Sequence, residues 1–221
     1  MSHFNQLKAV VFDFDGLMVN TEQIYDEVGD ELLGPRGRQF SSELKDQMMG
    51  RPAAAAIQVM IDFHSLDDSV QDLIDESDEI FNRILPLRLK PMPGLFELLE
   101  ELMTASIPFG IATSSRPAFV NRALELVAID ASFQFILTGE DVVNGKPHPE
   151  IYHKAVANLE LTAEGVLVLE DSEIGCRAAV AAGTRAVAVP GEHSRHHNFS
   201  GAEFVADTLA DRRIYDLLRL G

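Results

Sequence analysis

The chain has 221 residues, of which 46% are hydrophobic and 24% charged, the balance of a globular protein rather than a fibre or a disordered tail. Its 35 acidic and 18 basic residues give a formal charge of −17, which disfavours binding to nucleic acids and anionic membranes. Cys176 is the single cysteine, and no apolar run has the length of a signal peptide or a membrane span. We therefore expect a cytoplasmic monomer with no nucleic-acid or membrane partner.

Short apolar runs predict strands that are buried on both faces. They are Ala9–Phe12, Phe109–Ala112, Phe133–Leu137, Val166–Leu169 and Ala186–Val189. Between the later runs, residues 119–127 and 151–159 carry apolar stripes at helical spacing, and the Ala-rich stretch 174–182 stops at Gly183. Strands that alternate with helices predict an α/β fold, a doubly wound parallel sheet with helices on both faces.

Residues 17–88 break this alternation and contain no convincing strand. Four helices are expected there, starting near Glu22, Ser41, Pro52 and Asp67. The segment ends at a cluster of prolines, Pro86, Pro91 and Pro93. We expect an inserted helical domain at 17–88, joined by two short linkers to a sheet domain made of 1–16 and 89–221.

Two carboxylates follow the first predicted strand. Asp13 and Asp15 lie on the same side of the chain if it stays extended, and Gly16 permits a sharp turn directly after them. Because like charges repel, such a pair needs a cation or a shared proton. The simpler interpretation is a strand end with two solvated acids.

A second acidic pair, Glu170 and Asp171, follows the run Val166–Leu169. Adjacent parallel strands would bring the two pairs together at one edge of the sheet. Because carboxylates without a Cys or His cluster are hard oxygen ligands, the pattern favours Mg²⁺. Asp171 or Ser172 could also cap the following helix, and that role is compatible with metal binding.

Groups suited to an anion follow the other predicted strands. Thr113, Ser114 and Ser115 come after the run Phe109–Ala112, where hydroxyls and free N–H groups at a helix start can bind an anion. Lys146 stands between Gly145 and Pro147 and supplies a cation on a stiff loop. A phosphate beside several carboxylates needs such positive charge.

Four segments in order, FDFDGLMVNTE, GIATSS, GKPHPEIY and VLEDSEIGCRAAVAAG, resemble the motifs of the haloacid dehalogenase (HAD) superfamily. The resemblance covers essentially the whole chain and is to the β-phosphoglucomutase-like and pseudouridine-5′-phosphatase-like branch, which carries a helical cap. It implies a Rossmann-like catalytic core with an α-helical cap. It also implies Mg²⁺-dependent hydrolysis of a small phosphorylated metabolite, such as a sugar, polyol or nucleoside phosphate.

The resemblance assigns roles to the core residues. Asp13 would attack the phosphorus and form an aspartyl phosphate, and Asp15 would protonate the leaving oxygen and then activate water. Thr113, Ser114 and Lys146 would hold the transferring phosphoryl group.

The resemblance also implies a metal site and a substrate site. Mg²⁺ would be held by Asp13, the backbone carbonyl of Asp15 and Asp171, with Glu170 nearby. Substrate contacts would come from Gly16, Ser114, Ser115, Tyr25 and Arg51, and Met18 is a further specificity candidate. Arg51 could equally be a surface charge.

The chain departs from the branch at two positions. Asn20 replaces a common Asp, which we interpret as a hinge change that leaves the catalytic set intact, and Tyr25 stands where mutases carry a histidine. The second departure favours a phosphatase over a β-phosphoglucomutase-like phosphosugar mutase. A non-catalytic phosphate-binding protein is the remaining alternative, which the presence of both Asp13 and Asp15 argues against.

Two further features are interpreted as surface. Lys45 is expected to be an ordinary exposed helix residue, which argues against a phosphonatase with a Schiff-base lysine. His193, His196 and His197 form a polar loop that we expect at the surface rather than at a metal site.

Overall fold

A computed structural model describes residues 6–48 and 53–220. The chain divides into two compact units, Met1–Asn20 with Lys90–Gly221 and Thr21–Leu89, which we call the sheet unit and the helical unit. The chain first passes from the sheet unit to the helical unit after Asn20, whereas the sequence predicted this boundary after Gly16. Residues 17–19 are buried, and Val19 forms an antiparallel bridge with Pro91, so this stretch packs within the sheet unit.

The sheet unit is built on a parallel sheet with the order β3-β2-β1-β4-β5, which confirms the predicted fold class. Its strands are β1 (Ala9–Phe12), β2 (Phe109–Ala112), β3 (Ile136–Leu137), β4 (Val166–Glu170) and β5 (Arg185–Ala188). Phe12, the last residue of the central strand, pairs with Ile111 on one side and Leu169 on the other. The residues that follow β1, β2 and β4 therefore leave the sheet at one edge.

The predicted strand Phe133–Leu137 is too long. Only Ile136–Leu137 is regular strand, although the backbone of Gln134 and Phe135 already hydrogen-bonds to Phe109 and Ile111. The ring of Phe135 lies over Gly110, where an added Cβ would be 2.5 Å from a ring atom. The segment before β3 is thus held by aromatic packing as well as by a ladder.

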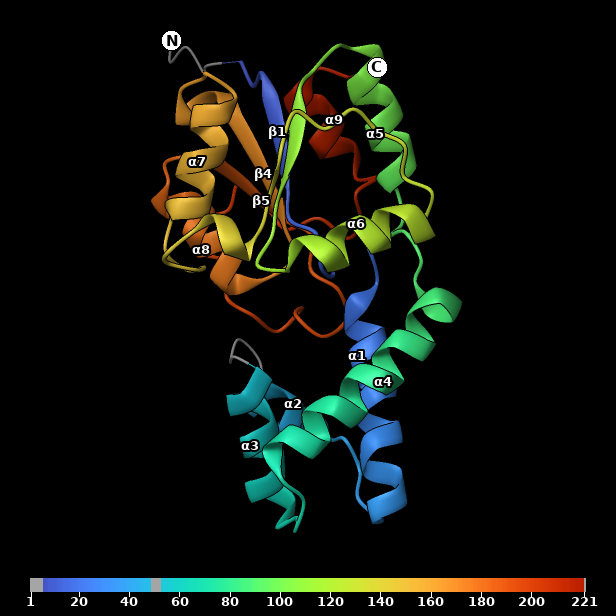
Figure 1. Cartoon of the computed structure of the whole chain (residues 1–221). Coiled ribbons are helices and arrows are strands. Elements are labelled where there is room, and N and C mark those ends of the chain that lie inside the picture. Colours follow the sequence, from blue (N-terminus) through green and yellow to red (C-terminus); the bar gives the residue numbers. More distant parts are fainter. Residues whose placement is uncertain (1–5, 49–52, 221) are drawn as a thin grey trace. The chain divides into compact units, whose positions relative to one another are not determined.

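Helices cover both faces of the sheet (Figure 1), with α7 (Glu150–Asn158) and α8 (Glu173–Ala181) on one side and α5 (Leu95–Thr104), α6 (Pro117–Leu126) and α9 (Arg212–Leu218) on the other. Ala9, Val11, Val166 and Val168 belong to the apolar core that includes α7 and α8. Because side chains alternate along a strand, Asp13 and Glu170, two positions after Val11 and Val168, point toward the same side of the sheet.

The helical unit contains α1 (Thr21–Leu33), α2 (Ser42–Met48), α3 (Ala53–His64) and α4 (Val70–Arg88). α4 starts three positions after the expected Asp67, because Ser69 caps it by accepting a hydrogen bond from the backbone N–H of Asp72. Pro86, the first proline of the cluster that ends this segment in the sequence, lies within the last turn of α4. The expected start of α3 at Pro52 lies outside the described residues.

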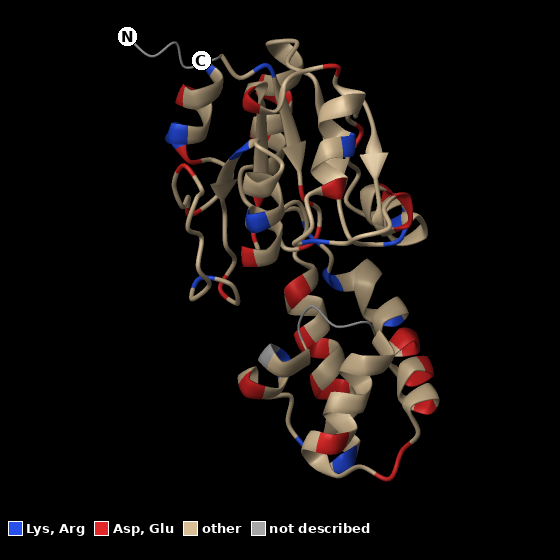
Figure 2. Ribbon diagram, turned by 90° about the vertical axis from the view of Figure 1, so that its left-hand side faces the viewer, with Lys and Arg blue, Asp and Glu red and all other residues tan. Residues whose placement is uncertain are grey.

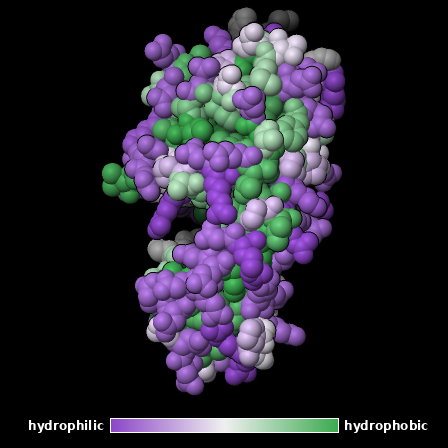
Figure 3. Space-filling view, turned by 45° about the vertical axis from the view of Figure 1, so that its right-hand side comes forward, coloured by the Kyte–Doolittle hydropathy of each residue, from purple (hydrophilic) through white to green (hydrophobic). Residues whose placement is uncertain are grey.

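The acidic composition is visible on the surface. Asp and Glu residues, red on the ribbon, occur along the helices of the helical unit (Figure 2), and the face of this unit seen in Figure 3 is largely hydrophilic. Arg36 is held here by Asp68 and Glu76, at 2.8 and 2.7 Å. Within 6–48 and 53–220, no helix is long and apolar enough to cross a membrane.

Candidate active site

Lys146 joins two carboxylates that leave neighbouring strands. Its Nζ donates to Asp13 Oδ1 at 2.5 Å, to Glu170 Oε1 at 2.7 Å and to the carbonyl oxygen of Ala112 at 3.0 Å. An ammonium has three protons, so these acceptors use all of them. The lysine side chain is only 4% exposed, and it therefore forms a buried ion pair with each carboxylate rather than a solvated one.

Glu170 is completely buried, and both of its carboxylate oxygens are occupied. Oε1 accepts from Lys146 and also from the hydroxyl of Tyr152 at 2.6 Å. Oε2 accepts from the backbone N–H and the hydroxyl of Ser172, at 3.2 and 2.9 Å. The orientation of Glu170 is thus fixed by α7 and by the start of α8.

Gly175 allows this carboxylate to lie against the first turn of α8. A Cβ built at Gly175 would fall 1.8 Å from Glu170 Oε1 and 2.0 Å from its Cδ. Ser172 also caps α8, since its Oγ accepts from the N–H of Gly175 at 3.1 Å. Ser172 therefore both caps α8 and donates to Glu170, and Gly175 leaves the space that the Glu170 carboxylate occupies.

Asp15 is bound by hydroxyls from the end of β2. Its Oδ2 accepts from Ser115 Oγ at 2.6 Å and from Thr113 Oγ1 at 3.2 Å. Thr113 Oγ1 in turn accepts from the backbone N–H of Ser115 at 3.0 Å. Gly16, with φ 75°, turns the chain immediately after Asp15, as the sequence predicted.

Burial dominates the electrostatics of the cluster. It raises the pKa of Asp13 above its ordinary value, with help from the carboxylates of Glu170 and Asp15 and against the opposing effect of the nearby Lys146 ammonium. Burial alone would lower the pKa of Lys146, but the charges of Asp13 and Glu170 raise it well above its ordinary value. The pKa of Tyr152 is raised by burial and then by Glu170, so its hydroxyl keeps its proton. The site favours additional positive charge.

Three carboxylates offer a place for a metal ion. One oxygen from each of Asp13, Glu170 and Asp171 lies within 4.8 Å of the others, and all three residues are buried. Hard oxygen donors of this kind fit Mg²⁺. Both oxygens of Glu170 already accept hydrogen bonds within the protein, so a metal ion coordinated directly by Glu170 would compete with these donors.

The predicted site residues of the sheet unit lie together: Asp13, Asp15, Thr113, Lys146, Glu170 and Asp171. Other predicted residues, Ser114, Met18 and Tyr25, have different surroundings. Ser114 is exposed, and its carbonyl oxygen would lie 2.5 Å from a Cβ added at Gly139. Met18, a specificity candidate from the sequence, is completely buried and therefore packs as a core residue. Arg51 lies outside the described residues.

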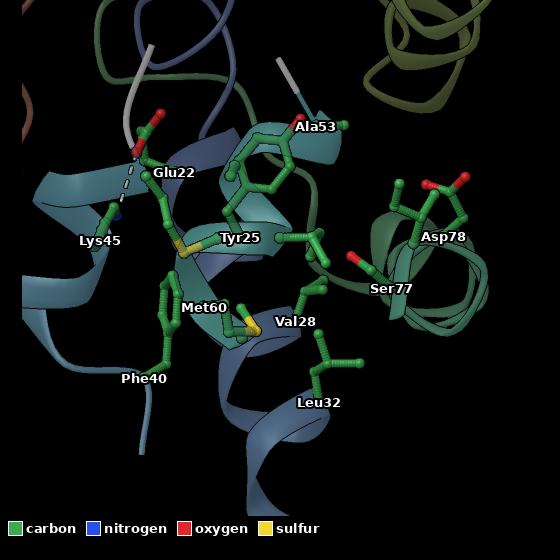
Figure 4. Close-up of a pocket in the computed structure, with 15 residues that line it drawn as sticks. Glu22, Tyr25, Val28, Leu32, Phe40, Lys45, Ala53, Met60, Ser77 and Asp78 are labelled. Atoms are coloured by element: carbon green, nitrogen blue, oxygen red, sulfur yellow. Dashed lines mark ion pairs between the residues drawn. The ribbon is translucent and has the colours of Figure 1, made fainter. Parts of the chain in front are cut away.

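Tyr25 lines a pocket within the helical unit (Figure 4). Tyr25 is 45% exposed, and its ring stacks on that of Phe81 with the centroids 5.3 Å apart. The cavity measures about 430 Å³, and most of its lining is apolar: Val28, Leu32, Phe40, Ile57, Met60 and Ile74 belong to it. This is the size range of small-molecule sites.

Lys45 was expected to be exposed, and that expectation is wrong. Its side chain is only 12% exposed at the edge of the same pocket, where Nζ lies 2.7 Å from Asp26 and 3.2 Å from Glu22 of α1. Its spacing on α2 gave no sign of the acids on α1, because that contact depends on how the two helices pack.

Tyr152, Ser172 and Gly175 were not recognised as parts of the site by sequence reasoning. Ser172 was considered only as a cap, and Tyr152 lies in the segment GKPHPEIY without a role of its own. A polar hydroxyl within the apolar stripe of α7 was the available signal, because a buried Tyr hydroxyl usually has a partner.

The histidine loop contributes nothing to the acidic cluster. Among the residues that the structure describes, Asp13, Glu170 and Asp171 form the one group with metal-binding spacing. His196 is exposed, and its ring meets that of His197 edge to face with the centroids 4.6 Å apart.

Comparisons with known proteins agree with this geometry. The family model described as "Haloacid dehalogenase-like hydrolase" matches residues 10–189. A Thermotoga maritima protein named "Phosphorylated carbohydrates phosphatase" is 30% identical over 177 residues, which cover 80% of this chain and 82% of that protein. The Drosophila melanogaster "Probable pseudouridine-5′-phosphatase" is 31% identical over 207 residues, covering 91% and 89%.

A solved structure is similar along its whole length. The crystal structure of a HAD family hydrolase from Deinococcus radiodurans R1, with bound phosphate and sodium, superposes with a TM-score of 0.83. Its sequence is 26% identical, and the match covers 97% of each chain. The fold of this chain is therefore shared with a hydrolase whose structure holds phosphate.

Replacing Gly175 with Ala tests the close approach of Glu170 to α8. Helix propensity alone would make Ala stabilising by up to about 1 kcal/mol. Because the added Cβ overlaps Glu170, we expect the free energy of unfolding to fall instead, by about 1–3 kcal/mol in urea denaturation. Gly191→Ala is the matched control, since a Cβ built at Gly191 meets no described atom beyond its chain neighbours within 4 Å. A stabilised Gly175→Ala variant would contradict the described packing.

Proposed function

The chain belongs to the haloacid dehalogenase-like hydrolase family, and from this premise we propose that it is a Mg²⁺-dependent phosphatase acting on a small phosphorylated metabolite. The relatives named as phosphatases support this choice of reaction. The observation that carries the proposal is the buried Lys146–Asp13 contact of 2.5 Å at the end of the central strand. It places a carboxylate and a fixed cation together where a phosphoryl group could be held.

Asp13 is proposed to be the nucleophile. One of its carboxylate oxygens attacks the phosphorus, the bond from phosphorus to the leaving oxygen breaks, and an aspartyl phosphate forms. The leaving oxygen takes the proton of Asp15, which accepts hydrogen bonds from Thr113 and Ser115 in the free protein. Asp15 then removes a proton from the water that attacks the phosphorus, which releases phosphate and restores Asp13.

Charge neutralisation is the second part of the proposal. Lys146, whose three protons are donated within the free protein, would stay beside Asp13 and stabilise the transferring group through its charge, and the backbone N–H groups around Ser114 would bind the phosphoryl oxygens. Asp13 and Asp171 would hold the metal, with the carbonyl of Asp15 as a further ligand and Glu170 behind Lys146. Bound Mg²⁺ would neutralise charge on the phosphoryl oxygens.

The helical unit is proposed to act as a cap that selects the substrate. Tyr25 supports this role, since its ring is half exposed on a pocket of small-molecule size. Arg51 remains a proposed contact for a polar part of the substrate. A sugar, polyol or nucleoside phosphate fits the proposal, and a phosphosugar mutase is the alternative that the same residues would permit.

Asp13→Asn should lower turnover by more than about 1,000-fold, because an amide cannot act as the nucleophile. The measurement is phosphate release from a panel of phosphomonoesters and sugar phosphates with Mg²⁺. Asp130→Asn, an exposed position, is the matched control and should behave as the wild type. Substantial hydrolysis by Asp13→Asn would exclude this nucleophile, and activity only with a bisphosphate primer would favour the mutase.

Removal of the metal provides a second test. We expect EDTA to abolish phosphate release and Mg²⁺ to restore it. Asp171→Asn should raise the Mg²⁺ concentration for half-maximal activity by at least about tenfold, because a neutral amide is a poorer ligand for a hard cation. Isothermal titration with Mg²⁺ measures the same loss without turnover. An unchanged affinity in Asp171→Asn would place the ion elsewhere.

Tyr25→Ala tests the role of the helical unit. We expect the ranking of substrates by kcat/KM to change, while hydrolysis of the small substrate acetyl phosphate stays within about threefold of the wild type. Phe63→Ala is the matched control, because Phe63 is a similarly exposed aromatic residue of α3 that does not line the pocket. An equal loss for every substrate would assign Tyr25 to folding rather than selection.

A further inference from the structure

We propose that Tyr152 is a positioning residue for the reaction, whose hydroxyl acts through Glu170 to keep Lys146 on Asp13. The inference rests on the proposed phosphatase function. It extends that function to a residue on α7 that lies behind the reacting groups and touches neither substrate nor metal in the mechanism above.

The chain of contacts is direct and buried. Tyr152 Oη lies 2.6 Å from Glu170 Oε1, the same oxygen that accepts from Lys146 Nζ at 2.7 Å. Tyr152 and Glu170 are both 0% exposed. Water therefore has no surface access through which it could replace the phenolic hydroxyl if that group were removed.

Glu170 Oε1 accepts hydrogen bonds from two donors, the hydroxyl of Tyr152 and the ammonium of Lys146. With Tyr152 present, Glu170 Oε1 shares its hydrogen bonding, and the shortest contact of the ammonium is the 2.5 Å one to Asp13. Without the hydroxyl, Lys146 would be the only side chain donating to that oxygen among the described residues. We expect the ammonium to shift toward Glu170 and away from Asp13. A buried carboxylate oxygen that has lost one hydrogen-bond donor interacts more strongly with the cation that remains beside it.

The ring of Tyr152 contributes separately from its hydroxyl. Lys146 Nζ lies 5.1 Å from the ring centroid, and the ring packs in the core formed by α7, α8 and the sheet. Tyr152→Phe keeps this ring and removes only the oxygen. The variant therefore separates the hydrogen bond to Glu170 from the packing of the aromatic ring.

The experiment compares the wild type and Tyr152→Phe in steady-state hydrolysis of acetyl phosphate with saturating Mg²⁺. We expect kcat to fall about 5- to 50-fold while KM changes less than about threefold, because the lost positioning matters most as charge develops on the phosphoryl group. Inhibition constants provide a second readout. Vanadate, which mimics the transition state, should bind more weakly to the variant, whereas inorganic phosphate should bind about equally.

Two controls distinguish positioning from a general structural effect. Tyr215→Phe removes a hydroxyl from α9, away from the acidic cluster, and should leave kcat unchanged. In a Glu170→Gln background, Tyr152→Phe should change kcat by less than about threefold, because residues that act through one another are not additive. Tyr152→Phe and Tyr215→Phe should both keep the far-ultraviolet circular dichroism of the wild type, which reports the backbone and does not depend on the tyrosine that each variant lacks.

Each result decides one statement. Wild-type kcat in Tyr152→Phe, or a full additive loss in the Glu170→Gln background, would overturn the positioning role while the phosphatase function stands. Equal weakening of vanadate and phosphate would also overturn it, because a general distortion of the site affects both. A wild-type protein that releases no phosphate from any tested ester would overturn the proposed function and this inference with it.

Discussion

The position of one buried ammonium determines the arrangement of the candidate site. Lys146 reaches across the edge of the sheet and donates its three protons to Asp13, Glu170 and the end of β2. Burying an ion pair is costly unless every partner is satisfied. The surrounding structure meets this requirement, since Tyr152 and Ser172 complete the hydrogen bonding of Glu170.

The fold supplies this satisfaction through its strand ends and helix starts. Parallel pairing of β1 with β2 and β4 brings their last residues side by side, and α7 and α8 pack on the face toward which Glu170 points. Because Gly175 has no Cβ, the carboxylate of Glu170 can lie against the first turn of α8. The same contacts that stabilise the core therefore hold an excess of carboxylates, which is the condition that favours a bound cation.

The sequence predicts those parts of the site that depend on local order along the chain. Asp13 and Thr113 directly follow apolar runs, and Asp15 comes two residues after Asp13, so strand pairing brings all three to one edge of the sheet. Contacts that depend on helix packing were not predictable in this way. The hydroxyl of Tyr152 could not be assigned to Glu170 before the rotation of α7 was known. The exposure of Lys45 was predicted wrongly because its acidic partners lie on another helix. The strand Phe133–Leu137 was predicted too long because its aromatic residues, typical of strands, also occur in the irregular segment before β3.

Direct detection of a phosphorylated Asp13 tests the account most sharply. Acetyl phosphate has a good leaving group and needs little acid assistance, so Asp15→Asn should still form the aspartyl phosphate but hydrolyse it slowly. After acid quenching and digestion, mass spectrometry should find the mass of one phosphoryl group on the peptide that contains Asp13, and none in the Asp13→Asn variant. A covalent phosphoryl group on another residue, or rapid turnover with no phosphorylated Asp13 at any quench time, would contradict the account.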